Sequence, residues 1–66
     1  MITVNRRHEL PWHPGITVRE VLQAMKYTYN DIVVRVDGRV VPDEDYDTAA
    51  IPDGADVRVI HLIAGG

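Results

Sequence analysis

The sequence predicts an α+β fold in which one helix packs across one face of a mixed sheet. One strong helix signal lies at residues 18–27, with short β-branched segments on both sides of it. Asp37-Gly38 is a two-residue hairpin signal between two such segments. The last ten residues form a Val- and Ile-rich strand pattern that runs into two glycines.

The first twelve residues predict a β-hairpin. Residues 1–5 alternate apolar and polar side chains, as a half-buried strand does. Residues 9–12 form the returning strand, and Pro11 favours a place at the sheet edge, where a proline removes no ladder hydrogen bond. We expect Trp12 to cover one end of the core, while residues 13–15 (His-Pro-Gly) end the strand.

A helix is predicted over residues 18–27. Thr17 as N-cap with Glu20 three residues later has the spacing of a capping box, and Ile16 with Val21 has that of a hydrophobic staple. The apolar stripe at positions i, i+3, i+4 and i+7 consists of Val18, Val21, Leu22 and Met25. This stripe is expected to face the sheet.

A second hairpin follows the helix. Residues 32–36 are strongly β-branched, Asp37-Gly38 predicts a type I′ turn, and residues 39–41 return until Pro42 ends the strand. If Arg35 faces water, the alternation of a strand turns three residues toward the helix, namely Ile32, Val34 and Val36.

The remaining chain predicts a short helical turn and a final strand. Residues 43–50 lack strand alternation and predict a turn of 3₁₀ or α-helix with Tyr46 tucked inward, and residues 51–54 predict a turn. In the last strand Ile60 and Leu62 lie in the opposite phase from the valines at 57 and 59. They should therefore emerge on the sheet face away from the helix, where, with Arg35 and Arg58, they are candidates for docking a partner.

Composition excludes several classes of function. The chain has 66 residues and is expected to be a single domain, residues 1–66, with a small core and no roomy active-site pocket of its own. The absence of cysteine excludes a disulfide framework, a thiolate metal site and a cysteine nucleophile. No catalytic residue is predicted, because no Ser/His/Asp arrangement or phosphate-binding loop is present.

Charge and targeting signals narrow the partners. No signal peptide or membrane-spanning run is present, so the expected protein is soluble and cytoplasmic, without a membrane partner and monomeric when free. The net charge of −3 and the lack of a basic patch disfavour nucleic acid, while the acidic residues between Asp43 and Asp56 favour a basic protein partner. Neither these carboxylates nor His8, His13 and His61 match a metal-ligand spacing, so no metal is expected.

The two glycines at the end of the sequence carry the strongest functional hint. Gly65 and Gly66 have no Cβ, so bare backbone could be threaded into a narrow cleft of another protein, with Ala64 just before it. What would arrive in that cleft is a carboxylate on an unhindered carbon. The alternative is a frayed terminus.

The order of predicted elements is that of the β-grasp, or ubiquitin-like, fold. The chain resembles sulfur carriers of the ThiS type, within the wider ThiS and MoaD group. The residues that carry the resemblance are 2–5, Gly15, 17–18, Leu22, 34–42, Tyr46, 53–54, Val57 and 63–66. Two loops depart from the pattern: Asn5-Arg6-Arg7 stands where relatives often have Asn-Gly-Glu, and Gly54-Ala55-Asp56 where they often have Gly-Asp.

The resemblance implies a protein carrier rather than an enzyme. An E1-like adenylyltransferase of the ThiF type would use ATP to adenylate Gly66, and the carrier would have no cofactor of its own. Sulfur from a donor such as a cysteine desulfurase would then give a thiocarboxylate. The implied acceptor is a thiazole synthase of the ThiG type, which builds the thiazole of thiamin.

Three other functions stay open from the residues alone. A MoaD-like small subunit of molybdopterin synthase shares the fold and the tail. A ubiquitin-like modifier would join Gly66 to lysines of other proteins, and a plain interaction module would never have its tail activated. An autonomous enzyme is disfavoured, because no site for one is visible.

Overall fold

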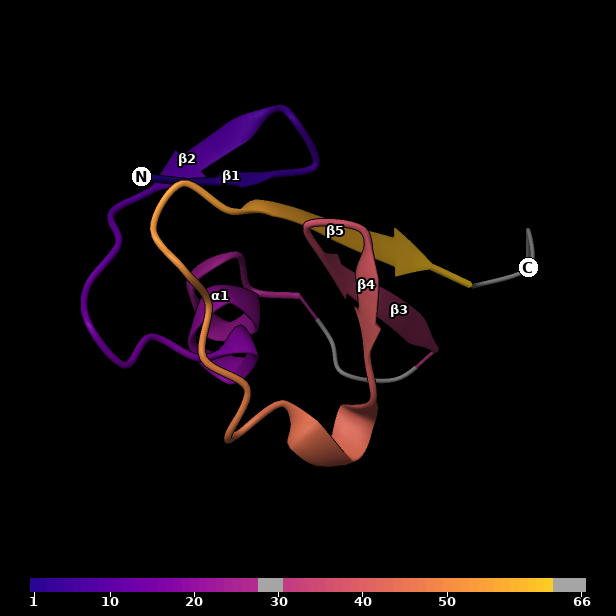
Figure 1. Ribbon diagram of the computed structural model, residues 1–66. Coiled ribbons are helices and arrows are strands. Elements are labelled where there is room, and N and C mark those ends of the chain that lie inside the picture. The colour runs from indigo at the N-terminus through magenta and orange to yellow at the C-terminus, as the bar shows by residue number, and fades with distance from the viewer. Residues whose placement is uncertain (28–30, 63–66) are drawn as a thin grey trace.

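The computed structural model describes residues 1–27 and 31–62, and they form a five-stranded sheet with one α-helix (Figure 1). The strand order is β2-β1-β5-β3-β4. In chain order the elements are β1 (Ile2–Val4), β2 (His8–Leu10), α1 (Val18–Ala24), β3 (Ile32–Val36), β4 (Arg39–Val41), the 3₁₀ helix η1 (Asp43–Asp45) and β5 (Asp56–His61). The predicted α+β class and β-grasp topology are confirmed.

The final strand lies at the centre of the sheet. β5 runs parallel to β1, with Thr3 opposite Asp56, and antiparallel to β3, with Val34 opposite Val59. Because β1 and β3 hydrogen-bond to the backbone of β5 on its two sides, the position of β5 in the sheet is tightly defined. The predicted edge position of the second strand is also confirmed, although β2 covers 8–10 rather than 9–12.

The two hairpin turns use residues with positive φ. Asp37 and Gly38 have φ of 50° and 85°, the type I′ geometry that the sequence predicted. In the first hairpin Asn5 and Arg6 both have φ of 55°. Arginine carries a steric cost of roughly 1–2 kcal/mol in this left-handed region, which glycine would avoid.

Helix α1 begins as predicted but ends three residues early. Thr17 caps it, with its Oγ1 accepting a hydrogen bond from the Glu20 N–H at 3.4 Å. At the other end Lys26 has φ of 59°, and the Lys26 and Tyr27 N–H groups donate to the carbonyls of Gln23 and Leu22, both at 3.0 Å. These bonds form a Schellman motif, which closes a helix. The predicted end at residue 27 was wrong because a lysine occupies the left-handed position where glycine is the usual signal.

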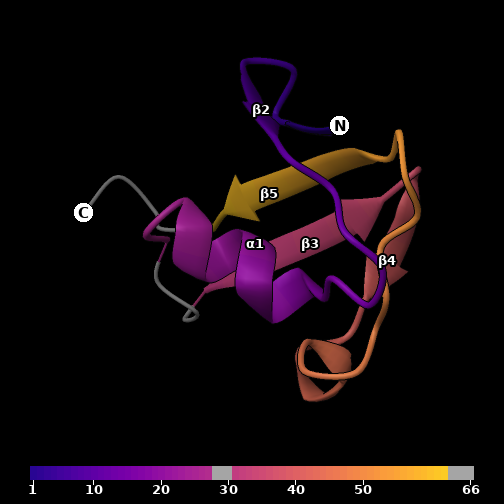
Figure 2. The same cartoon turned by 90° about the vertical axis from the view of Figure 1, so that its left-hand side faces the viewer.

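The core lies between α1 and one face of the sheet. Figure 2 shows the helix in front of β5 and β3. The helix contributes Val18, Val21 and Leu22, all fully buried, and Met25 packs against the core as a partly buried residue. The sheet and the segments after η1 contribute Ile2, Val4, Val34, Tyr46, Ile51, Val57 and Val59. The predicted inward phases of the helix, of β3 and of Tyr46 are confirmed.

Candidate functional site

The sequence predicts that the functional part of the chain begins at the end of β5. The strand ends at His61, and Leu62 is the last described residue. The predicted tail residues Ala64, Gly65 and Gly66 lie outside the described residues. The site is therefore built from the surface that precedes them.

Two contacts fix the point at which the chain leaves the sheet. The Leu62 N–H donates to the Asp31 carbonyl at 2.7 Å, which extends the β5–β3 pairing by one residue. The His61 ring meets the Tyr27 ring edge to face, with centroids 5.0 Å apart and planes at 83°. Four residues follow Leu62, and at 3.3–3.6 Å per residue they can reach at most roughly 14 Å from it. A partner that holds Gly66 must therefore lie close to this end of the sheet.

The sheet face away from α1 gathers the predicted docking residues. Ile60 is 43% exposed and Leu62 is 57% exposed, whereas Val57 and Val59 are buried in the core. Arg35 is exposed and lies directly opposite Arg58 in the β3–β5 pairing. We call Arg35, Arg58 and Ile60 the outer patch; Leu62 follows it at the strand end.

The outer patch surrounds a shallow cavity. The cavity has a volume of about 270 Å³ and is lined by Arg35, Gly38, Asp56, Arg58 and Ile60. Arg58 Nη2 lies 3.4 Å from Asp56 Oδ2, so one guanidinium has a carboxylate beside it. Within the described residues Arg35 has neither an ion pair nor a side-chain hydrogen bond.

Two residues near this surface were missed by sequence reasoning. Val40 is 58% exposed and lies opposite Arg35 in the β3–β4 pairing, so it extends the outer face. The Asp37-Gly38 turn fixes that register, because a two-residue loop pairs Val36 with Arg39 and therefore Arg35 with Val40. Val40 could thus have been found from the sequence. The contact of Asp56 with Arg58 had a signal too, since residues i and i+2 of a strand share a face.

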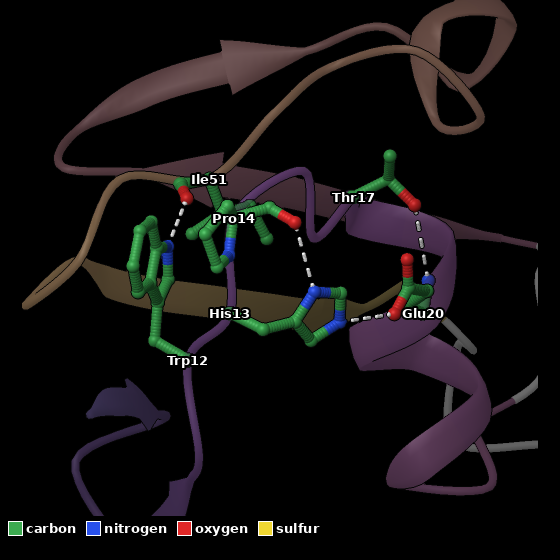
Figure 3. A network of polar contacts seen from close by, with 6 residues as sticks. All are labelled: Trp12, His13, Pro14, Thr17, Glu20 and Ile51. Carbon is green, nitrogen blue, oxygen red and sulfur yellow. Dashed lines mark hydrogen bonds and ion pairs between the residues drawn. The ribbon is translucent and has the colours of Figure 1, made fainter.

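A polar network joins the segment after β2 to the start of α1 (Figure 3). Trp12 Nε1 donates to the Ile51 carbonyl at 2.7 Å, which anchors this half-buried ring against the core. His13 Nδ1 lies 3.0 Å from the Pro14 carbonyl oxygen, and Nε2 lies 2.8 Å from a Glu20 carboxylate oxygen. Of the predicted capping box, only the bond from the Glu20 N–H to Thr17 Oγ1 forms within the described residues, because the Glu20 carboxylate pairs with His13 instead.

This network makes stability depend on the protonation of His13. Both neighbours of the ring are acceptors, so only the imidazolium donates to both, and these bonds to Pro14 and then Glu20 raise the pKa of His13. A raised pKa in the folded state means that the stabilisation is complete below the unfolded pKa of about 6.5 and is lost as pH rises through the folded value. We expect the urea midpoint at roughly pH 5.5 minus that at roughly pH 8.5 to be smaller in His13→Gln than in the parent, because the stabilisation at low pH is lost.

His8→Gln is the matched control for this titration. His8 is exposed on the edge strand β2 and has no side-chain hydrogen bond or ion pair within the described residues. Its replacement should leave the difference between the two pH values as in the parent. An unchanged difference in His13→Gln would show that the protonation of His13 contributes nothing to stability.

No metal centre or membrane helix was found in the part of the chain that the structure describes. Within residues 1–27 and 31–62, no three His, Cys, Asp or Glu side chains are grouped to hold a metal ion. In the same residues, no helix is long and apolar enough to cross a membrane.

The comparison with known families decides the identity of the chain. The model of the ThiS family matches residues 2–66, which is nearly the whole sequence. The chain belongs to the ThiS family. It is similar to the crystal structure of the thiamine biosynthesis protein ThiS from Geobacter metallireducens, at 27% identity and a TM-score of 0.77, covering 98% of this chain and 97% of that one.

A second solved structure gives the same result for this ThiS family member. The solution structure of a thiamine biosynthesis protein from Geobacter metallireducens has 27% identity and a TM-score of 0.75. The alignment covers 98% of this chain and 86% of that one. The β-grasp assignment thus agrees with a crystal structure and a solution structure as well as with the strand order.

Proposed function

We propose that this protein is a sulfur carrier for the thiazole of thiamin. The observation that carries the proposal is the ThiS family match, which extends through Gly65 and Gly66. The two solved structures reported above are described as thiamine biosynthesis proteins, which favours the thiamin branch over a molybdopterin synthase subunit.

The proposed chemistry takes place on the carboxyl group of Gly66. A ThiF-type adenylyltransferase joins this carboxylate to the α-phosphate of ATP, which gives an acyl-adenylate and releases pyrophosphate. The terminal sulfur of a persulfide, formed on a donor such as a cysteine desulfurase, then attacks the acyl-adenylate and displaces AMP. A thiol reduces the resulting acyl disulfide, forms a disulfide with the donor and leaves a thiocarboxylate. A ThiG-type thiazole synthase transfers the sulfur to its substrate, and an oxygen atom from that substrate or from water restores the carboxylate of the carrier.

Physical features of the chain support a substrate role. A residue without Cβ adopts extended conformations in a narrow channel more easily than any other, and the sequence has two at its end. The contacts of His61 and Leu62 hold the start of the tail in place, so a docked partner would meet it at a defined point. ATP is consumed by the activating partner, and the carrier needs no cofactor of its own.

The function is tested by reconstitution with two acceptors. The chain is incubated with the ThiF-type enzyme, ATP and a sulfur donor, and is then supplied to a thiazole synthase or to the large subunit of molybdopterin synthase. Thiazole formation without molybdopterin formation supports the proposal. Molybdopterin formation alone would replace it with the MoaD-like function, and conjugates with lysines of other proteins would replace it with a modifier function.

We further propose that Ile60 and Leu62, with Arg35 and Arg58, contact the activating enzyme. Ile60→Ser should weaken the complex by about tenfold, because central apolar contacts carry much of the energy of an interface. The melting temperature should hardly change, since Ile60 is 43% exposed in the free chain. Calorimetric titration and thermal unfolding measure the two effects.

Ala24→Ser is a control for this substitution, because Ala24 is exposed at the end of α1. This variant should bind like the parent. A collapse of the melting temperature in Ile60→Ser would show that the side chain belongs to the core rather than to a docking surface.

A further inference from the structure

Two arginines face each other on the outer patch without enough negative charge to balance them. Arg35 and Arg58 are directly opposite in the β3–β5 pairing. Like charges directly opposite each other on neighbouring strands destabilise a sheet. Asp56 pairs with Arg58 alone, so the cavity lining contains two guanidinium groups and one carboxylate. This local excess of positive charge stands out in a chain whose net charge is −3.

Hydrogen-bonding groups in the cavity lining are also left unpaired. Arg58 Nε and Asp56 Oδ1 are buried, and neither has a hydrogen-bond partner within the described residues. Buried donors and acceptors are almost always paired in folded proteins, because an unpaired one keeps its desolvation cost. The ion pair of Arg58 with Asp56 is therefore incompletely satisfied, and the exposed guanidinium of Arg35 beside it is open to a group from outside.

Guanidinium groups fit carboxylates better than other common protein groups. Two N–H donors of one arginine match the two oxygens of a carboxylate, and such charge-assisted bonds are roughly twice as strong as neutral ones. A second copy of this chain is a poor occupant, because pairing two outer patches would bring four arginines together. The apolar side chain of Ile60 borders the same cavity.

We infer that the outer patch receives an acidic side chain of the activating enzyme. Its carboxylate binds the exposed guanidinium of Arg35 beside Arg58, and an adjacent apolar side chain packs on Ile60. This inference rests on the proposed function, which requires that enzyme to bind the unmodified chain. It reverses one expectation from the sequence: at this surface the partner is acidic, although the acidic segment between Asp43 and Asp56 favoured a basic one.

The test compares Arg35→Glu with Arg39→Glu. Both residues are exposed and flank the same hairpin turn, so the two variants have the same change in net charge. Arg39 pairs with Val36 rather than facing Arg58, and it lines a separate hollow of about 470 Å³ with Val36, Asp37, Val41, Ala50 and Pro52. Only Arg35→Glu places a negative charge at the proposed carboxylate site.

We expect Arg35→Glu to raise the Kd for the ThiF-type enzyme by at least about tenfold, and Arg39→Glu to change it by less than about twofold. The denaturant midpoint of Arg35→Glu should equal or exceed that of the parent, because an opposite charge then faces Arg58. The Kd of Arg35→Gln should lie between the values of the parent and of Arg35→Glu. The Kd of the parent should depend more steeply on salt than that of Arg35→Gln. Weaker binding together with undiminished stability identifies a docking role.

Equal effects of Arg35→Glu and Arg39→Glu would overturn the inference, because net charge alone would then explain them. Unchanged binding in Arg35→Glu would also overturn it. Both results leave the proposed function intact so long as the parent supports ATP–pyrophosphate exchange. A parent chain that supports no exchange would contradict the proposed function itself, whichever variant is compared.

Discussion

Deleting Gly66 should abolish ATP-dependent activation of this chain while leaving its fold unchanged. The activating enzyme must place the carboxylate in line with the α-phosphate of ATP, and a carboxylate one residue short, on Gly65, cannot reach that position. Misplacing a reacting group by even about 1 Å can cost a hundredfold in rate, and one residue spans roughly 3.3–3.6 Å. ATP–pyrophosphate exchange with the ThiF-type enzyme measures the loss directly.

Two controls separate the chemistry of the tail from its folding. Adding one residue after Gly66 should abolish exchange as completely as the deletion does, because the reacting group is again displaced. Thermal unfolding of both variants should match the parent, since chain ends contribute little to stability unless other contacts tie them down. Equal exchange rates for the parent and the deletion would refute the carrier mechanism.

Replacing Leu22 by alanine should remove a large part of the stability of the domain. Leu22 is fully buried between α1 and the sheet, and its carbonyl accepts the Tyr27 N–H that closes the helix. Truncation of a buried leucine typically costs 2–5 kcal/mol, because transfer free energy is lost and a cavity remains. A small domain has roughly 5–15 kcal/mol in all, so urea unfolding should show a much lower midpoint.

The next residue in the helix is a matched control for this prediction. Gln23 is exposed, and Gln23→Ala keeps a good helix former at the same depth along α1. Its free energy of unfolding should stay within about 0.5 kcal/mol of the parent. A loss below about 0.5 kcal/mol in Leu22→Ala would mean that the helix packs through another face.

Local signals were enough to predict most of the fold. The Asp37-Gly38 turn set a hairpin register, Thr17 set the helix start, and the charge of Arg35 set the phase of β3. Each of these depends on residues a few positions apart, so it is visible in the sequence. The exposure of Ile60 and Leu62 also followed from strand alternation alone.

What could not be predicted depends on residues that are distant in the sequence or on unusual conformations. Asn5 Oδ1 accepts the Val59 N–H at 2.8 Å, and Asp37 Oδ1 accepts the Asp56 N–H at 2.9 Å. Both bonds join the backbone of β5 to side chains of turns elsewhere in the chain, and no local sequence pattern predicts them. The helix end at Lys26 was missed because local sequence rules expect glycine at such a position.

The candidate site divides in the same way. Its residues were found from strand phase and a terminal motif, whereas its electrostatics required the structure. The lone carboxylate of Asp56 beside Arg58, and the absence of one beside Arg35 within the described residues, emerged only once the strands were paired. The inferred acidic partner therefore rests on tertiary geometry.

The intact mass of the protein purified without reductant from its native host tests the central claim most directly. The proposed function predicts a fraction of the chain whose mass corresponds to the sequence ending at Gly66 with one oxygen atom replaced by sulfur. Fragment spectra should place that sulfur on the terminal carboxyl group, and deletion of the gene for the ThiF-type enzyme should eliminate the fraction. A population of entirely unmodified mass, identical with and without that gene, would contradict the carrier function.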